Sequence, residues 1–283
     1  MKLAKFIKLK QEEALNAGKE DSAVIFLLED VLNLTPTTLF NQLDEKIKDE
    51  DILKFNKLFD LYLNHNKPVQ YLVGKTTFYG YDFIVNEDVL IPRFETEELV
   101  ENILYRYDKY FKGKKVEVAD IGTGSGAIAI ALAKEEPNMT LTATDISSKA
   151  LEVAKTNAKN LGVDITFLEG DMLSPLTKKY DILVSNPPYI PDSEEVSKLV
   201  KDNEPNIALF GGNDGLKFYR IILSEAKDYL KDKAMICFEH GYDKKKEIES
   251  LAKLNFPKAR VETLKDLEGR DRMTFIYIGD FNE

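Results

Sequence analysis

The sequence predicts an α/β protein with a seven-stranded, mostly parallel sheet, preceded by a small all-helical N-terminal domain. Two observations predict this class. Apolar residues recur at helical spacing up to about residue 75, and strand and helix patterns alternate from Lys115 onward. Such alternation favours a parallel sheet with helices on both faces. Because ligands of such sheets bind beyond the carboxyl ends of the strands, functional residues are expected just after the strands.

The N-terminal helices are predicted from three features of residues 1–75. An apolar stripe comes first, Thr35-Pro36 then resembles an N-cap with proline at the first helical position, and a second stripe follows. The helix after Pro36 is expected to run through Leu43. The stripe residues are Val24, Leu27, Leu28, Val31 and Leu32, then Ile52, Phe55, Phe59 and Tyr62.

Residues 76–92 change character, with aromatic and β-branched residues around Gly80 and Asn86 that predict a β-hairpin linking two domains. The second domain is then 93–283. Its candidate strands are 115–120, 140–145, 165–169, 180–185, 234–239, 259–263 and 273–278, with helical patterns at 148–160 and 214–230 among those between them.

Composition narrows the function. The chain has 283 residues, a net charge of −10 and 43% hydrophobic residues, which is typical of a folded protein. Its longest apolar run, 127–133, is far shorter than the roughly 20 residues of a membrane span. The single cysteine, Cys237, fits a reducing cytoplasm, and two histidines with one cysteine are too few for a usual zinc site. We therefore expect a cytoplasmic protein with no membrane segment and no metal.

The negative charge is spread evenly. Residues 1–92 hold 11 basic and 15 acidic side chains, so no basic half is present. Phosphate contacts supply most of the affinity of proteins for nucleic acid. A direct nucleic-acid partner is therefore not expected.

A glycine-rich turn follows the first candidate strand of the second domain. Gly122, Thr123, Gly124, Ser125 and Gly126 lead into an apolar helix, and such glycines allow sharp turns and close approach of a ligand. The helix that follows offers unpaired N–H groups. With Ala127 in place of a third glycine, the turn also satisfies a dinucleotide-binding pattern.

Acidic residues end the next two candidate strands. Asp145 could accept both hydroxyls of an adenosine ribose, or could simply cap a helix. Asp171 with Met172 could bond the adenine amino group and pack on its ring. These residues fit either NAD or S-adenosylmethionine.

The fourth strand ends in Asn186-Pro187-Pro188-Tyr189. The prolines fix φ and lack N–H donors, so their carbonyls are expected to point into the cleft as acceptors. Asn186 adds an amide oxygen, and Tyr189 an aromatic face. This set suits an NH₂ group on a planar substrate, although Asn-Pro and Pro-Pro also occur in ordinary turns.

The glycine turn and the Asn-Pro-Pro-Tyr tetrapeptide together resemble class I, Rossmann-like S-adenosylmethionine-dependent methyltransferases that modify planar nitrogens. KPVQYLVGKTTFYGYDFIVNEDVLIPRFETEELV (67–100), EPNIALFGGNDGLKFYRIILSEA (204–226) and DLEGRDRM (266–273) are similar to the HemK/PrmC family. That family methylates the glutamine of the Gly-Gly-Gln motif in peptide chain release factors. The sequence departs from the family pattern at Phe94 and Met172.

The resemblance implies a role for each site residue. The turn 122–126 would hold the amino-acid part of S-adenosylmethionine, Asp145 its ribose, and Asp171 with Met172 its adenine. Asn186, which also borders the cofactor, and the Pro187 carbonyl would accept the two amide hydrogens, with Pro188 and Tyr189 completing the site. His240 is expected to be a rim residue and Cys237 a core residue. The helical domain would hold the release factor, and the protein would act as a monomer.

Three alternatives stay open. The substrate could be a glutamine of a ribosomal protein. An adenine-specific DNA methyltransferase would need a basic cleft and a target-reading insertion, which the sequence lacks. A dinucleotide-binding module without chemistry would leave the tetrapeptide 186–189 unexplained.

Overall fold

The protein forms two compact units in a computed structural model that describes residues 1–281, without the side chains of Lys198 and Leu199. One unit comprises Met1–Lys75 and Val196–Asn203, and the other comprises Thr76–Glu195 and Glu204–Glu283. The chain therefore returns once to the first unit, at a segment that the sequence did not single out.

The first unit is helical. Its helices are α1 Leu3–Asn16, α2 Ser22–Leu32, α3 Pro36–Asn41, α4 Asp49–Asn64, α5 Val69–Val73 and α9 Lys198–Lys201. Their apolar faces meet around Phe55, whose ring lies 5.1 Å from that of Phe6 and 5.1 Å from that of Phe59. The Thr35 hydroxyl accepts from Thr38 N, which confirms the predicted cap. The helix ends at Asn41, so the expected extension to Leu43 was wrong.

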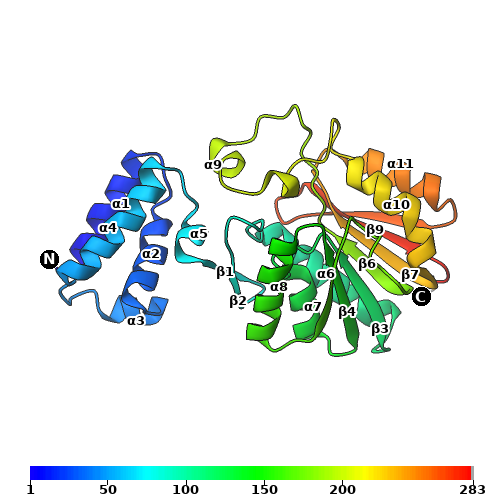
Figure 1. Cartoon of the computed structure of the whole chain (residues 1–283), viewed down its shortest axis with the longest axis horizontal. Helices are drawn as coiled ribbons and strands as arrows, with labels where there is room; N and C mark the ends of the chain where they lie inside the picture. The colour runs from blue at the N-terminus through cyan, green and yellow to red at the C-terminus, as the bar shows by residue number, and fades with distance from the viewer. Residues whose placement is uncertain (282–283) are drawn as a thin grey trace. The chain divides into compact units, whose positions relative to one another are not determined.

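The second unit contains the predicted seven-stranded sheet (Figure 1), in the order β5-β4-β3-β6-β7-β9-β8. Neighbouring strands from β5 to β7 are parallel, whereas β9 is antiparallel to both β7 and β8. The strands are β3 Val116–Ile121, β4 Met139–Asp145, β5 Ile165–Glu169, β6 Tyr180–Ser185, β7 Leu230–Glu239, β8 Arg260–Lys265 and β9 Asp271–Ile278. The strand order reverses between β3 and β6, which is where ligands bind in such sheets.

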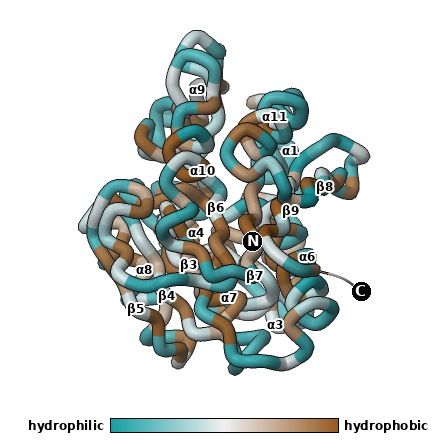
Figure 2. Tube along the Cα trace, turned by 90° about the vertical axis from the view of Figure 1, so that its right-hand side faces the viewer, coloured by the Kyte–Doolittle hydropathy of each residue, from teal (hydrophilic) through white to brown (hydrophobic). Residues whose placement is uncertain are grey.

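Helices cover both faces of this sheet. They are α6 Phe94–Tyr110, α7 Ala127–Glu135, α8 Ser148–Leu161, α10 Lys217–Tyr229 and α11 Lys245–Asn255, with a short 3₁₀ turn η1 at Asn206–Ala208. Successive strand residues point to opposite faces, so Val118 and Cys237 lie in one core cluster and Ala119 and Ile236 in the other. The expectation that Cys237 belongs to the core is confirmed. Figure 2 shows hydrophobic residues in the strands and also along the helices that cover them.

The predicted hairpin is formed by β1 Lys75–Phe78 and β2 Tyr81–Ile84. Tyr79 and Gly80 both have positive φ, 50° and 77°, as a two-residue hairpin turn of the primed kind requires. The hairpin ends at Ile84, so Asn86 lies outside it.

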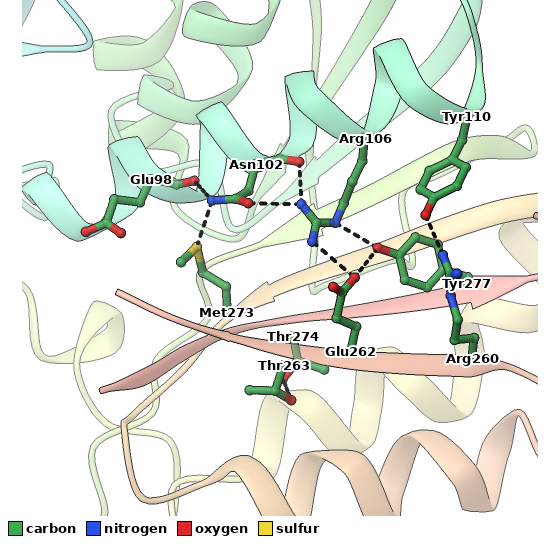
Figure 3. Close-up of polar contacts among 10 residues, drawn as sticks. All are labelled: Glu98, Asn102, Arg106, Tyr110, Arg260, Glu262, Thr263, Met273, Thr274 and Tyr277. Carbon is green, nitrogen blue, oxygen red and sulfur yellow. Dashed lines mark hydrogen bonds and ion pairs between the residues drawn. The ribbon is translucent and has the colours of Figure 1, made fainter. Parts of the chain in front are cut away.

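Helix α6 was not predicted, and a buried arginine attaches it to the sheet (Figure 3). Arg106 Nε donates to the Tyr277 hydroxyl at 2.7 Å, and Nη2 lies 3.1 Å from Glu262. The guanidinium also lies 3.9 Å from the centre of the Phe275 ring. These contacts hold α6 against β8 and β9. Within residues 1–281, no helix has the length and apolar character needed to cross a membrane.

Candidate active site

One cavity of about 270 Å³ lies at the carboxyl ends of the central strands. The turns after β3, β4 and β5 line it with residues 122–125, 145–147 and 170–172, and Asn186 and Pro188 line it after β6. The structure therefore brings together most of the site residues that the sequence predicted. Gly126, Pro187 and Tyr189 are the predicted residues that do not line it.

The glycine turn leaves room for a ligand at two positions. Gly122 and Gly124 have φ of +73° and +57°, and a β-carbon added at either would meet no atom within 4 Å. Gly126 is different, because a β-carbon there would lie 2.9 Å from Ile130 Cδ1 and 3.2 Å from Ala154 Cβ. Gly126 therefore permits α7 to pack closely on α8, and it does not border the cavity.

Asp120 supports this turn from behind. The Thr123 hydroxyl donates to its Oδ2 at 2.6 Å, while Oδ1 has no hydrogen-bond partner among the described residues. Burial raises the pKa of Asp120 to about 7, against the lowering effect of the Thr123 hydrogen bond. A buried carboxyl oxygen without a donor costs free energy. The site thus retains an acceptor directly behind the cavity wall.

Asp145 both lines the cavity and fixes the turn. Its Oδ2 accepts from Gly124 N and its Oδ1 from Ser147 N, each at 2.9 Å. Burial raises the pKa of this half-buried carboxyl, and the backbone donors oppose that shift. Ile146 N also bonds this carboxylate, and because two oxygens can accept about four hydrogen bonds, the turn role and a ligand role are compatible.

Asp171 and Met172 close the adjacent wall. Asp171 is exposed, whereas Met172 is buried with φ of +45°, an unusual value for a side-chain-bearing residue. The Thr144 hydroxyl donates to the Met172 carbonyl at 3.0 Å, which holds this backbone in place. Met172 thus presents an apolar side chain at the strand end, as expected from the sequence.

Part of the tetrapeptide 186–189 lines the cavity, and part of it packs against the glycine-containing segment 211–215. A β-carbon on Gly211 would lie 2.4 Å from the Pro188 carbonyl oxygen, and one on Gly215 would lie 2.2 Å from that of Tyr189. The Pro188 carbonyl thus packs against Gly211, so the expectation that both proline carbonyls point into the cleft was wrong. Burial raises the pKa of the Tyr189 phenol to about 12, so it is neutral at physiological pH.

Two buried polar residues beside Asn186, Thr96 and Glu239, were not predicted, nor was the pairing of Arg93 with Glu204. Asn186 Nδ2 lies 3.2 Å from the Thr96 hydroxyl, which donates to Glu239 at 2.7 Å. Arg93, which lines the cavity, pairs with the buried Glu204. Thr96 and Glu239 are 143 residues apart, so no local spacing could have indicated the pair.

His240 is buried and does not lie at a rim, which corrects the expectation from the sequence. Its Nδ1 lies 2.9 Å from the Gly241 carbonyl and its Nε2 lies 2.9 Å from the Thr274 hydroxyl. Burial lowers its pKa, which favours the neutral ring. Strand β9 covers this position, and the sequence pattern did not indicate that cover. Over the described part of the chain, no group of acidic, histidine or cysteine residues could hold a metal ion.

Known proteins are similar in sequence to this chain over nearly its whole length. The family model "PrmC N-terminal domain" matches residues 10–74, and "Methyltransferase small domain" matches 96–203. The release factor glutamine methyltransferase of Streptococcus pneumoniae is 42% identical, with 98% of each chain covered. That of Bacillus cereus is 42% identical, over 91% of this chain and 93% of the relative. This chain belongs to the release factor glutamine methyltransferase family.

Solved structures agree with this family assignment at the level of the fold. A methyltransferase from Pyrococcus furiosus has a TM-score of 0.53 and 18% identity, covering 71% of this chain and 91% of that one. At this level of identity the likeness concerns the fold alone.

Proposed function

We propose that this member of the family methylates the side-chain amide nitrogen of the glutamine in the Gly-Gly-Gln motif of peptide chain release factors. The observation that carries the proposal is the meeting of two features at one cavity. A glycine turn with two open positions faces it from β3, and Asn186 faces it from β6. Family membership supplies the substrate class, because the relatives are named release factor glutamine methyltransferases.

The residues present fit S-adenosyl-L-methionine, which supplies a methyl group activated on a positively charged sulfur. The open space beside Gly122 and Gly124 suits the amino-acid part. Asp145 retains lone pairs for the ribose hydroxyls, and Met172 offers a polarizable apolar surface to the adenine. The half-exposed Ile146 also lines the cavity and adds a further apolar wall.

Asn186 would orient the substrate amide. An amide nitrogen is a poor nucleophile because its lone pair is delocalised. Asn186 Oδ1, which lines the cavity, would accept one of its hydrogens and so orient the nitrogen for attack. The same oxygen would stabilise the positive charge that develops on nitrogen, because it is oriented before the reaction. Pro187 does not line the cavity, so its carbonyl would accept the second hydrogen only after the turn 186–189 shifts. Tyr189, neutral and half-buried, does not line the cavity, so it would limit movement of the amide plane only after the same shift of the turn.

The helical region 1–75 is proposed as the release-factor-binding domain, with the hairpin segment 76–92 as linker and 93–283 as the methyltransferase domain. The evenly spread negative charge suits a basic protein partner and gives nucleic acid no basic groove. We further propose that the protein acts as a monomer in the cytoplasm, where release factors work.

The test uses methyl-labelled S-adenosyl-L-methionine and two forms of a purified release factor, one intact and one with the motif glutamine changed to alanine. We expect label on the first and none on the second. Label on neither, with cofactor binding retained, would refute the substrate. A ribosomal protein and a DNA duplex in the same assay test the alternatives, and a titration with NAD tests the dinucleotide-binding reading.

Asn186→Ala tests the proposed role of the amide. Loss of one oriented acceptor typically costs about 10²-fold or more in kcat. We expect a fall in kcat of that order with the Kd of S-adenosyl-L-methionine changed less than about threefold. Unchanged kcat with weaker cofactor binding would assign Asn186 to the cofactor alone.

A further inference from the structure

A buried hydrogen-bonded chain links Asn186 to a carboxyl group that the proposed reaction does not use. Asn186 Nδ2 donates to Thr96 Oγ1 at 3.2 Å, and Thr96 Oγ1 donates to Glu239 Oε2 at 2.7 Å. The Asn186 side chain is also hydrogen-bonded directly to Glu239. Thr96 is 4% exposed and Glu239 is 2% exposed, so water does not compete for these bonds. The three residues come from α6, the end of β6 and the end of β7.

The chemistry of the three groups sets the direction of the chain. A threonine hydroxyl has a single hydrogen, and an ionised carboxylate can only accept. Thr96 must therefore donate to Glu239 and accept from Asn186. Only Nδ2 of Asn186 can donate, so its amide has one orientation, with Oδ1 directed away from Thr96. The two ends of an asparagine amide are nearly equal in shape, so packing alone would not select between them.

Other elements hold Glu239 in place. The Tyr219 hydroxyl on α10 donates to the Glu239 backbone carbonyl at 2.7 Å. Arg272 on β9 attracts the carboxylate, but Arg272 Nε is itself bonded to Asp266 at 3.1 Å. Glu95 on α6 repels it. The neighbouring Tyr189 and Tyr219 have raised pKa values and His240 has a lowered pKa, so all three are uncharged at neutral pH. The charged groups that face the Glu239 carboxyl are therefore Arg272 and Glu95.

We propose that Thr96 and Glu239 are positioning residues, which orient the Asn186 amide so that its oxygen is presented to the substrate nitrogen. This inference rests on the proposed function, because it needs an amide substrate that donates hydrogens to Asn186. Glu239 does not line the cavity, and Thr96 lines it beside Asn186. Their effect is to keep Asn186 in the one orientation that can accept.

Protonation of Glu239 removes the fixed donor-to-acceptor direction of these hydrogen bonds. The neutral carboxyl can donate to Thr96, and the freed Thr96 hydrogen can then donate to Asn186 Oδ1, which reverses the amide. Burial is the largest influence on Glu239 and raises its pKa to about 7, with the Thr96 hydrogen bond and Arg272 opposing the shift. The acceptor orientation is therefore favoured above about pH 7 and lost below it.

The test compares Thr96→Val with Thr96→Ser in the full chain, with label transfer to the release factor as the assay. Valine keeps the shape but removes the Thr96 acceptor, so that Asn186 Nδ2 keeps only its direct bond to Glu239, and kcat is expected to fall about tenfold. Serine keeps the hydroxyl and should stay within about threefold of the unaltered protein. The KM for the release factor and the Kd of S-adenosyl-L-methionine should change less than twofold in both variants.

A pH profile gives a second, independent readout. The kcat of the unaltered protein should rise as pH increases through about 7. Glu239→Gln cannot titrate, so this rise should disappear in that variant. Equal kcat for the valine and serine variants, or an unchanged rise in the glutamine variant, would overturn the proposal. Failure of the unaltered protein to label the release factor would instead refute the proposed function.

Discussion

At the residue scale, two buried carboxyl groups near the carboxyl ends of the strands have pKa values close to neutral pH. Asp120 is the penultimate residue of β3, before the glycine turn, and Glu239 ends β7 beside Asn186. Burial raises the pKa of each to about 7. Their ionisation therefore opposes folding as pH rises through about 7.

Asp120→Asn is predicted to weaken the pH dependence of stability. The folded-state pKa of Asp120 lies above its unfolded value, so the folded protein binds an extra proton between about pH 4 and 7. Stability is thus lost as pH rises through that window. The fall in Tm between pH 5 and pH 8 should be smaller in this variant than in the unaltered protein.

Asp214→Asn is the matched control for Asp120→Asn. The Arg220 hydrogen bond lowers the pKa of this exposed carboxyl to about 2, so Asp214 stays ionised throughout the range tested. Its variant should keep the pH dependence of Tm between pH 5 and pH 8. Equal flattening in both variants, or in neither, would contradict the assignment to Asp120.

At the element scale, the segment 209–215 acts as a backbone support for the Asn-Pro-Pro-Tyr turn. Ile190 N donates to the Leu209 carbonyl at 3.0 Å, and Gly211 N donates to the Ile190 carbonyl at 2.8 Å. Gly215 lies directly against the Tyr189 carbonyl. The Phe-Gly-Gly-Asn-Asp-Gly run therefore contains glycine because another backbone passes too close for a side chain.

Gly215→Ala is predicted to displace this turn. A β-carbon there would lie 2.2 Å from the Tyr189 oxygen, so the backbone at 189 must shift. Since a displacement of about 1 Å can cost about 10²-fold in rate, we expect a fall in kcat of that order.

Gly269→Ala is the control, because Gly269 has a similar φ of +81° but a β-carbon added there would meet no atom within 4 Å. It should lose about 1 kcal/mol of stability and no activity. Equal losses of kcat would contradict the prediction.

Arg106→Leu is predicted to loosen α6 from the sheet. It removes the Arg106 donors to the Tyr277 hydroxyl and to Glu262, although Tyr277 still donates to Glu262 at 2.7 Å. Because Arg106 is buried but Glu262 is partly exposed, the expected cost is about 2 kcal/mol. Arg260→Leu is the control, since Arg260 also lies over Tyr277, at 4.1 Å, but is exposed (Figure 3). Surface pairs contribute about 1 kcal/mol or less. Urea unfolding of both variants measures the difference, and equal losses would show that burial of Arg106 adds nothing.

At the scale of the whole molecule, the sequence predicted what depends on local pattern. The alternation of strand and helix patterns predicted the sheet. Gly122, Asp145 and Asn186 could be predicted as site residues because each lies at or directly after the carboxyl end of a strand. Long-range packing was beyond such patterns. Thr96 and Glu239 meet only after α6 crosses the sheet, His240 is buried only because β9 covers it, and the role of Gly126 depends on Ala154 of another helix.

The assignment of residues 196–203 to the helical unit is a further result of long-range packing, and it leads to a prediction for the full chain. Asn203 Nδ2 donates to the Asn66 carbonyl at 2.8 Å, so this segment belongs with residues 1–75 although it follows the Asn-Pro-Pro-Tyr turn. If the helical unit binds the release factor, both stretches should respond to it together.

Hydrogen exchange of the intact protein can test this with two ligands added separately. S-adenosyl-L-methionine should slow exchange at 122–126 and 145–147, because these turns line the cavity. The release factor should slow exchange within 1–75 and at 196–203, since buried or ordered amides open less often. Helix α11 serves as the internal control, because it lines no part of the cavity and belongs to the other unit. Protection by the release factor confined to residues 76–195 and 204–281 would show that the sheet unit alone recognises the substrate.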